Sequence, residues 1–210
     1  MIDEHETARR RGRGGHERIL AAATSLFETQ GINTTSMEQV AAQAPVSKRT
    51  LYQHFPTKDQ LVVAYLAHLI ETGRTMDGVL DRADLPPRQR LLELFAVPES
   101  AGPIRGCPFI DAAAEFPDPE SPVHAYTKQQ KQRFARRITD LVRQLGATHP
   151  EVLGEQLAIL ADGAASRSMV LNDPASGTHA RAAAEALLDA ASGNPGEAQR
   201  PIPRLDPPAT

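Results

Sequence analysis

The sequence predicts an all-α protein of about nine helices, and three observations lead to that fold class. Aromatic residues make up only 4% of the 210-residue chain and tryptophan is absent, whereas alanine and leucine are abundant. That composition favours helices over a β-sandwich or barrel. Apolar residues recur every three or four positions, and no segment alternates β-branched with polar residues as a strand would.

The composition also excludes several classes of protein. Cys107 is the only cysteine, so one chain can build neither an internal disulfide framework nor a multi-cysteine metal site. No apolar run approaches the length of a membrane span, and residues 1–15 lack the apolar core of a signal peptide. We therefore expect a cytoplasmic protein without metal, cofactor or membrane contact.

Charge is distributed unevenly along the chain, although the net charge is only −3. Near the N-terminus a ten-residue stretch is crowded with arginines and is opposed only by Glu17. The arginines are Arg9, Arg10, Arg11, Arg13 and Arg18. We predict that residues 1–15 form a flexible basic arm.

Three short-range patterns define the first helices. Apolar residues keep helical spacing from Glu17 onward, and Gly31 is placed to end that helix. Thr35 and Glu38 match a capping box, which predicts a second, brief helix that stops near Gln43. A turn follows, and the chain must change direction there.

A third short helix is predicted to open at Ser47. Leu51 and Phe55 stand four residues apart and so share a buried face, while the other positions are polar. A second capping box, formed by Thr57 and Gln60, starts a long helix whose apolar period continues to about residue 80.

Prolines punctuate the rest of the chain and set the remaining helix boundaries. The predicted helices lie at about 87–97, 104–115, 122–146 and 150–171, with a last one from Asp173-Pro174 to about residue 191. Residues 193–210 are rich in proline and poor in apolar residues, which predicts a disordered tail.

Two short helices joined by a tight turn have the arrangement of a helix-turn-helix, in which the first helix braces the second in the major groove of DNA. The second helix carries residue types suited to that task. Lys48, Tyr52, Thr35 and Lys58 are able to reach phosphates, while Arg49, Thr50 and Gln53 are types that read base edges. A solvated amphipathic turn is the alternative interpretation.

The order of residues favours the first interpretation. The segment TSMEQVAAQAPVSKRTLYQHF, which begins at Thr35, is followed by KDQL at Lys58. Together they closely resemble the DNA-binding domain of the TetR family of transcriptional regulators, and the resemblance covers roughly residues 16–65. The resemblance implies an all-helical chain with a ligand-binding and dimerising domain behind the DNA-binding one.

On this basis we expect four parts. The arm at 1–15 is followed by a DNA-binding domain at 16–60, whose helix-turn-helix lies at about 36–55. A ligand-binding and dimerisation domain at 61–192 and the tail at 193–210 complete the chain. The candidate DNA-binding residues are Thr35, Ser36, Ser47, Lys48, Arg49, Thr50, Tyr52, Gln53, His54 and Lys58. The arm is either a solvated leader or an extension that follows DNA into the minor groove.

One position departs from the family pattern. The turn between the second and third helices usually carries glycine where this sequence has Pro45. Proline fixes φ near −65°, whereas glycine is free to adopt positive values. We therefore predict a turn that is built differently, with a changed tilt of the recognition helix.

A homodimer on a palindromic operator is expected, because one such module reads too few base pairs to be specific. The last two predicted helices carry small residues that permit close helix approach and a four-helix bundle with a second copy. The predicted interface residues are Leu157, Leu160, Ala161, Ala164, Ser168, Ala180, Ala183, Ala184, Leu187 and Leu188. Packing within one chain is the alternative.

The resemblance further implies a pocket for a small-molecule effector among the middle helices. Candidate lining residues are Leu66, Ile70, Phe95, Cys107, Phe109, Ile110, Phe116, Tyr126 and Phe134, each of which also suits an ordinary core. Cys107 is either a buried small side chain or a thiol sensor. The basic face of the helix predicted at 122–146 is either solvated or attractive to an anionic effector.

The sequence thus predicts a DNA-binding regulator without enzymatic activity or catalytic residues, most simply a homodimeric repressor released by a small molecule. The resemblance implies that effector binding tilts the helix that begins near Thr57, which would span both domains. A thiol-responsive regulator is one alternative. A small helical enzyme using Cys107 with a histidine such as His124, and an interaction protein with an inactive reader, are two others.

Overall fold

The chain folds as helices throughout the residues that the computed structural model describes, 4–96 and 102–192. The prediction of an all-α fold with an N-terminal helix-turn-helix is therefore confirmed. The elements are α1 (Glu4–Gln30), α2 (Met37–Gln43), α3 (Lys48–His54), α4 (Lys58–Glu71), a 3-10 helix η1 (Met76–Asp81), α5 (Pro87–Glu93), α6 (Pro108–Glu115), α7 (Pro122–Gln144), α8 (Pro150–Leu171) and α9 (Ala175–Ser192).

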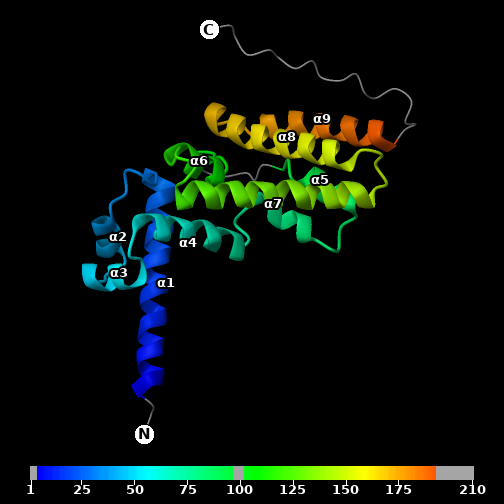
Figure 1. Ribbon diagram of the computed structural model, residues 1–210. Helices are drawn as coiled ribbons and strands as arrows, with labels where there is room; N and C mark the ends of the chain where they lie inside the picture. Colours follow the sequence, from blue (N-terminus) through cyan, green and yellow to red (C-terminus); the bar gives the residue numbers. More distant parts are fainter. Residues whose placement is uncertain (1–3, 97–101, 193–210) are drawn as a thin grey trace.

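The helices form two parts that lie side by side (Figure 1). At one end, α2 and α3 pack beside α1, which projects away from the rest of the molecule. At the other, α7, α8 and α9 pack against one another as a helical body. Helices α4 and α6 lie between the two parts, and both pack against α7.

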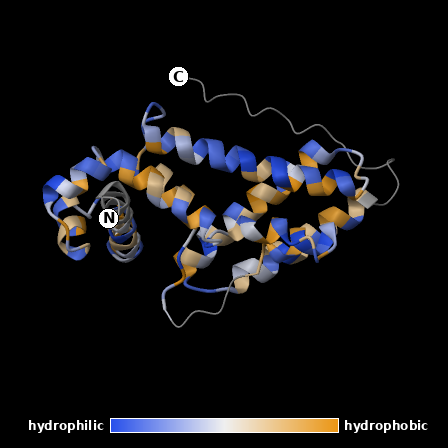
Figure 2. Ribbon diagram, turned by 90° about the horizontal axis from the view of Figure 1, so that it is seen from below, coloured by the Kyte–Doolittle hydropathy of each residue, from blue (hydrophilic) through white to orange (hydrophobic). Residues whose placement is uncertain are grey.

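Two hydrophobic cores hold this arrangement together. The first joins α1 to α4 through residues such as Ile19, Leu51 and Leu66, and continues into α6 at Phe109. The second joins α5, α7, α8 and α9 around residues such as Leu157. Most helices carry polar and apolar residues on different sides (Figure 2), as one buried face per helix requires. The expected domain boundary after residue 60 therefore falls inside a continuous core rather than at a break in packing.

Helix α1 is longer than the sequence predicts. It begins at Glu4, so residues 4–15 extend the helix and do not form a separate arm. Alanine, glutamate and arginine are strong helix formers, and in this segment they outweigh the low helix propensity of the glycines at positions 12, 14 and 15. The expected tail at 193–210 lies outside the described residues.

The second helix begins one residue later than predicted. Its N-cap is Ser36, whose hydroxyl accepts a hydrogen bond from the backbone of Gln39, and the Gln39 side chain accepts one from the backbone of Ser36. The predicted capping box of Thr35 and Glu38 is therefore displaced by one residue. Glutamine completes such a box as well as glutamate does, so the sequence holds two overlapping matches.

The turn between α2 and α3 keeps the geometry of a glycine turn despite its proline. Pro45 has a φ of 21°, and the backbone N–H of Val46 donates to the carbonyl of Ala41 at 3.0 Å. That bond is the outer one of a Schellman motif, whose inner bond requires an N–H that proline lacks. The turn therefore keeps the outer bond of a glycine turn but lacks the inner one and carries backbone strain. It is built differently to that extent, and a changed tilt of the recognition helix stays a prediction.

Helix α4 ends at Glu71, well before the predicted residue 80. Gly73 adopts a φ of 66°, and the N–H groups of Gly73 and Arg74 donate to the carbonyls of Ile70 and Leu69. This complete Schellman motif stops the helix, and η1 carries the apolar period onward.

The short helices of the middle region are also shorter than predicted. Helix α5 ends at Glu93, and α6 begins at Pro108 because proline is favoured in the first turn, where no N–H is needed. The segment before it, at 104–107, is extended and lies along the C-terminal end of α8, where the Ile104 N–H donates to Asn172 Oδ1 at 2.9 Å.

Candidate nucleic-acid interface and a cavity in the helical body

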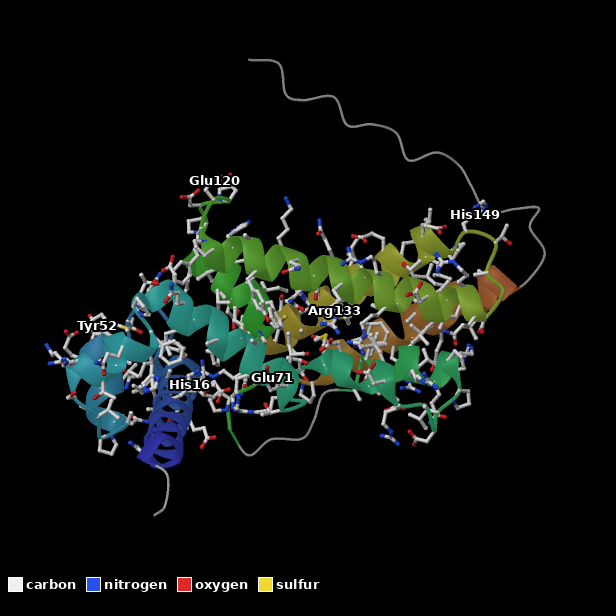
Figure 3. The ribbon with its side chains drawn as sticks, turned by 60° about the horizontal axis from the view of Figure 1, so that its bottom comes forward. His16, Tyr52, Glu71, Glu120, Arg133 and His149 are labelled. Atoms are coloured by element: carbon white, nitrogen blue, oxygen red, sulfur yellow. The ribbon has the colours of Figure 1, made fainter. Side chains whose placement is uncertain are left out.

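Helix α3 presents a polar face because its apolar residues are anchored in the first core. Leu51 is 0% exposed and Phe55 is 4% exposed. The residues between them turn outward, and Tyr52 is 44% exposed at the outer tip of the molecule (Figure 3). Arg49 and Gln53 are exposed as well. These three side chains are placed as predicted for a recognition helix.

Lys48 shares this face but already has a partner. Its Nζ lies 3.0 Å from Glu38 Oε1, and both side chains are more than half exposed. The hydrogen bond from Lys48 lowers the pKa of Glu38, so the carboxylate stays ionised at neutral pH. A solvent-exposed ion pair of this kind is weak, so a phosphate oxygen can displace Glu38 from Lys48.

The hydroxyl residues of the predicted interface mainly build the helices. Ser47 Oγ caps α3 by accepting from the Thr50 N–H at 3.1 Å, and it lies 2.8 Å from Thr50 Oγ1. Ser36 caps α2 in the same way. All three residues are at least partly exposed, so contact with DNA stays a prediction for them.

Thr35 is the predicted DNA contact that the structure contradicts. Its side chain is 1% exposed, and its hydroxyl donates to the carbonyl of Gly31 at 2.8 Å. Thr35 therefore fixes the loop between α1 and α2 from inside. Its neighbour Ser36 takes the exposed position because the cap begins one residue later than expected.

His54 is half-buried against α1. Its ring centroid lies 6.0 Å from that of His16, and a Cβ at Gly15 would stand only 3.0 Å from His54 Nε2. His16 also stacks 5.0 Å from Phe55. This cluster positions α3 on α1, a task that the sequence pattern did not indicate.

Lys58 lies at the first turn of α4, as predicted, but it is partly buried. Its Nζ donates to the backbone carbonyl of Asn33 at 3.2 Å. Burial lowers the pKa of Lys58, although the nearby carboxylates of Glu115 and Asp59 oppose that shift. Lys58 thus ties α4 to the α1–α2 loop, and its contact with DNA stays a prediction.

The same loop is held from the other side by Glu115, a residue that no sequence motif singled out. Its carboxylate accepts from the N–H of Ile32 at 3.0 Å and from the N–H of Asn33 at 2.5 Å. The Asn33 side chain donates to the Glu115 carbonyl at 3.0 Å. Helices α4 and α6 therefore converge on Asn33.

A cavity of about 420 Å³ lies where α4, α6, α7 and α8 meet. Five of the predicted pocket residues line it: Ile70, Phe95, Cys107, Phe109 and Phe134. The other four, Leu66, Ile110, Phe116 and Tyr126, belong to or pack against the first core instead. Helical period identified them as inward-facing, but it does not tell which of two cores a residue enters.

One polar group of the cavity, Lys131, belongs to the basic face predicted for the helix at 122–146. Lys131 forms an ion pair with Asp162, and its Nζ lies 5.4 Å from the centre of the Phe134 ring. Burial acts to lower the pKa of Lys131, but neighbouring Cys107 and Asp162 outweigh burial and leave the pKa raised. Lys131 therefore stays protonated at the wall of the cavity.

Most of the predicted dimer-interface residues are buried inside the chain. Leu157, Ala161, Ala164, Ser168, Ala180, Ala184 and Leu188 are at most 9% exposed, and Leu160 and Leu187 are half-buried against the same core. Only Ala183 is exposed. The small-residue stripes of α8 and α9 serve packing within the chain, which was the alternative interpretation.

A different face of α8 is apolar and exposed. Val152 is 49%, Ile159 62% and Val170 76% exposed, and their spacing of seven and eleven residues puts them on one stripe. Gly163 lies on the same side, with open space where a Cβ would stand. The exposed side of α9 carries Ala182, Ala183, Ala186 and Ala190. Exposed isoleucine and valine on a helix were not distinguishable from core residues in the sequence.

Other kinds of site find no support in the described ranges. Residues 4–96 and 102–192 hold no group of three or more His, Cys, Asp or Glu side chains that could bind a metal ion. Over the same residues, no helix is both long and apolar enough to span a bilayer.

Comparison with known proteins agrees with this geometry. Residues 19–65, which include α2, the turn and α3, match the model of the family described as bacterial regulatory proteins, tetR family. The HTH-type transcriptional regulator YjdC of Escherichia coli is 29% identical over 177 residues, which cover 82% of this chain and 92% of YjdC. The HTH-type transcriptional repressor Rv3405c of Mycobacterium tuberculosis is 45% identical over 73 residues, 33% of this chain and 39% of that protein.

The likeness extends to the whole fold. The crystal structure of a TetR-type transcriptional regulator from Streptomyces avermitilis superposes with a TM-score of 0.73 at 28% sequence identity. The superposition covers 86% of this chain and 99% of that one. Both the DNA-reading end and the helical body are therefore shared with solved structures of regulators.

Proposed function

This chain belongs to the TetR family of DNA-binding transcriptional regulators, and from that membership we propose that it is a homodimeric repressor that leaves a palindromic operator when a small molecule occupies its cavity. The observation that carries the proposal is the convergence on Asn33 of two helices whose other ends line the cavity. We propose a cytoplasmic protein that acts without enzymatic activity.

The exposed face of α3 supports the proposed mode of DNA reading. Arg49 and Gln53 stand one helical turn apart and carry donors suited to guanine and adenine edges. Lys48 and Tyr52 flank them and suit phosphate oxygens, which fix the register of the helix on the duplex. The remaining predicted contacts, Ser36, Ser47, Thr50, His54 and Lys58, surround this group.

The exposed apolar stripe of α8 supports the proposed dimer. Apart from Tyr52, the large apolar residues that are well exposed in the described ranges are Val152, Ile159, Val170 and Leu171, all on α8. An apolar stripe beside the alanine face of α9 suits a four-helix bundle between two copies. The two-fold symmetry of such a dimer would present both α3 helices to a palindrome.

The contacts at Asn33 support the proposed release. Ile70, Gly73 and Arg74 at the C-terminal end of α4 line the cavity, as do Cys107 and Phe109 at the start of α6. At their other ends, Lys58 of α4 and Glu115 of α6 bond the α1–α2 loop. A molecule that favours one spacing of α4 and α6 would therefore bias the position of α2 and α3.

A thiol-responsive regulator is a second candidate because Cys107 lines the cavity beside the ammonium of Lys131. Cys107 is the only cysteine of the sequence, so it is the only thiol that an oxidant or electrophile could modify. Alkylation with N-ethylmaleimide that lowers DNA affinity in the protein, but not in Cys107→Ser, would support this candidate. Unchanged DNA affinity after complete alkylation would reject it.

Fluorescence anisotropy with duplex DNA from the region upstream of the gene tests the main proposal. We expect salt-sensitive binding to a palindromic segment at two protomers per site. The double variant Arg49→Ala/Gln53→Ala should lose specific binding. Its matched control, Arg136→Ala/Gln132→Ala on the exposed side of α7, should bind as the parent does. Failure to bind any palindrome from that region at low salt would overturn the proposal.

A further inference from the structure

We propose that the cavity binds a mainly apolar organic anion, with its negatively charged group at Arg105 and a hydrogen-bond acceptor at Ser168. This inference deepens the proposed function, since it names the class of molecule that would act as effector. It rests on the cavity walls, an unpartnered buried hydroxyl and the balance of charge around the cavity.

The walls of the cavity suit an apolar molecular body. Phe95, Phe109 and Phe134 supply aromatic surface, and Ile70, Met76 and Leu94 supply aliphatic surface. A space of about 420 Å³ is in the range of small-molecule sites. Burying a ligand's apolar surface against these side chains would supply most of the binding free energy.

Ser168 marks a place for a polar atom of the ligand. Its side chain is 1% exposed and lines the cavity from α8. Its hydroxyl has no hydrogen-bond partner among the described residues. A buried hydroxyl without a partner is costly, so a ligand oxygen that accepts from Ser168 Oγ would remove that cost on binding.

The charged residues at the cavity make it electropositive. Arg74, Arg105 and Lys131 line it, against the single carboxylate of Asp77. Three of these four groups have a partner of opposite charge: Arg74 pairs with Glu28, Lys131 with Asp162, and Asp77 with Arg137.

Arg105 is the exception within the described ranges. Its guanidinium donates a hydrogen bond to the backbone carbonyl of Thr29 at 3.4 Å. No carboxylate of the described residues lies within 4.0 Å of the guanidinium. Arg105 is exposed and lines the cavity, and a guanidinium there suits a carboxylate in a two-pronged contact. Among the described residues, Arg105 is thus the lining cation without a close ion-pair partner, although it interacts at longer range with the carboxylate of Asp111.

Arg105 and Ser168 come from neighbouring segments. Residues 104–107 lie along the C-terminal end of α8, where a Cβ at Gly106 would stand 2.9 Å from Met169 Sδ and Ile104 bonds Asn172. The cationic rim and the buried hydroxyl therefore belong to one side of the cavity. An anion with a second acceptor along its body matches that placement.

Isothermal titration calorimetry on the DNA-free protein tests this inference. The probes are hexanoate, octanoate, decanoate and 2-naphthoate, each compared with the matching alcohol, hexan-1-ol, octan-1-ol, decan-1-ol or 2-naphthylmethanol. We expect at least one carboxylate to bind about tenfold more tightly than its alcohol. Arg105→Gln should abolish that preference. Ser168→Ala should remove any gain in affinity that 6-methoxy-2-naphthoate, which carries a second acceptor oxygen, shows over 2-naphthoate.

Two matched variants serve as controls. Arg133→Gln removes an exposed arginine of α7 (Figure 3), and Ser166→Ala removes a serine of α8 that does not line the cavity. Both should bind the probes as the parent does. Equal affinity for acids and alcohols, no effect of Arg105→Gln, or no binding of any carboxylate at millimolar concentration would each overturn the inference. DNA binding plays no part in this measurement, so its outcome is independent of the operator test.

Discussion

Asn33 donates two hydrogen bonds to Glu115, which lies 82 residues further along the chain. The Asn33 backbone N–H donates to Glu115 Oε2 at 2.5 Å, and the Asn33 side-chain amide donates to the Glu115 carbonyl at 3.0 Å. Lys58 bonds the Asn33 carbonyl from α4. Asn33 is therefore hydrogen-bonded to both helices, α4 and α6, that connect the cavity with the helix-turn-helix.

Replacing Glu115 with alanine should uncouple the two parts of the molecule. The variant leaves two backbone N–H groups of the α1–α2 loop without their acceptor, so we expect unfolding free energy to fall by about 1.5 kcal/mol. DNA binding should persist, because α3 and its core are unchanged, while its response to a bound carboxylate should weaken. Thermal denaturation and anisotropy with and without the ligand measure both effects.

Glu120→Ala is the control for that variant, since Glu120 is exposed in the loop before α7 (Figure 3). It should change neither stability nor ligand response. A Glu115→Ala protein whose DNA affinity still responds to ligand as the parent does would show that the signal travels by another route.

Replacing Pro45 with glycine should stabilise the protein. Glycine accepts a positive φ without strain and restores the N–H that the inner bond of the Schellman motif requires. Strain of this kind costs about 1–3 kcal/mol, whereas the greater freedom of glycine in the unfolded chain costs about 0.4–1 kcal/mol.

We expect a net gain of about 1 kcal/mol from Pro45→Gly, or a rise in melting temperature of about 2–4 °C. Differential scanning calorimetry of the parent and the variant measures it. Pro117→Gly, in the loop after α6, is the control and should lower stability slightly through unfolded-state entropy. A Pro45→Gly protein that melts below the parent would show that the turn is unstrained.

Asp111 should make stability depend on pH in a direction opposite to that of most carboxylates. Burial raises its pKa, the nearby Glu115 carboxylate raises it further, and Arg105 only partly opposes the shift. A raised native pKa means that the ionised form destabilises the fold, and this cost applies in full above the native pKa. The cost disappears below the unfolded value of about 3.9, where Asp111 is protonated in both states.

Asp111→Asn should therefore be more stable than the parent at pH 7, and the difference should shrink as the pH falls toward 4. Urea denaturation at several pH values measures this difference. Asp118→Asn, in the exposed loop after α6, is the control for the general effect of removing a carboxylate. A difference for Asp111→Asn that grows as the pH falls would contradict the argument.

Local signals in the sequence predicted what depends on neighbouring residues. The caps at Ser47 and Thr57 and the buried pair of Leu51 and Phe55 were readable because each involves residues three or four positions apart. The start of α2 and the end of α4 were misplaced, although the end of α2 at Gln43 was predicted correctly. Overlapping cap signals and one permissive glycine, Gly73, are decided by small energy differences.

Contacts between distant segments were not readable. No local pattern distinguishes Glu115 from other helix residues, because its partner Asn33 is brought to it only by the fold. Ser168 lies in a stripe of small residues that was predicted to form the dimer interface, but it is buried within the chain. Helical period identifies a buried face, but the covering partner depends on tertiary packing. Seven predicted interface positions proved to be core for that reason, and the exposed Ile159 was overlooked.

Ile159→Glu tests the revised interface directly. Ile159 is 62% exposed, so a charge there costs the free monomer little, but it would be desolvated at the centre of an α8 interface. We expect light scattering to show a shift from dimer to monomer with unchanged helical content by circular dichroism. Specific DNA affinity should fall sharply, because two half-sites would no longer be bound as a unit.

Gln132→Glu on the exposed side of α7 adds the same charge away from the proposed interface, so it should remain dimeric. Ala158→Glu would be an unsuitable comparison because Ala158 is buried, and the variant would test folding instead. An Ile159→Glu protein that stays dimeric at micromolar concentration would move the interface away from the stripe of Val152, Ile159 and Val170. The dimer would then have to be sought on another face, such as the exposed alanine side of α9.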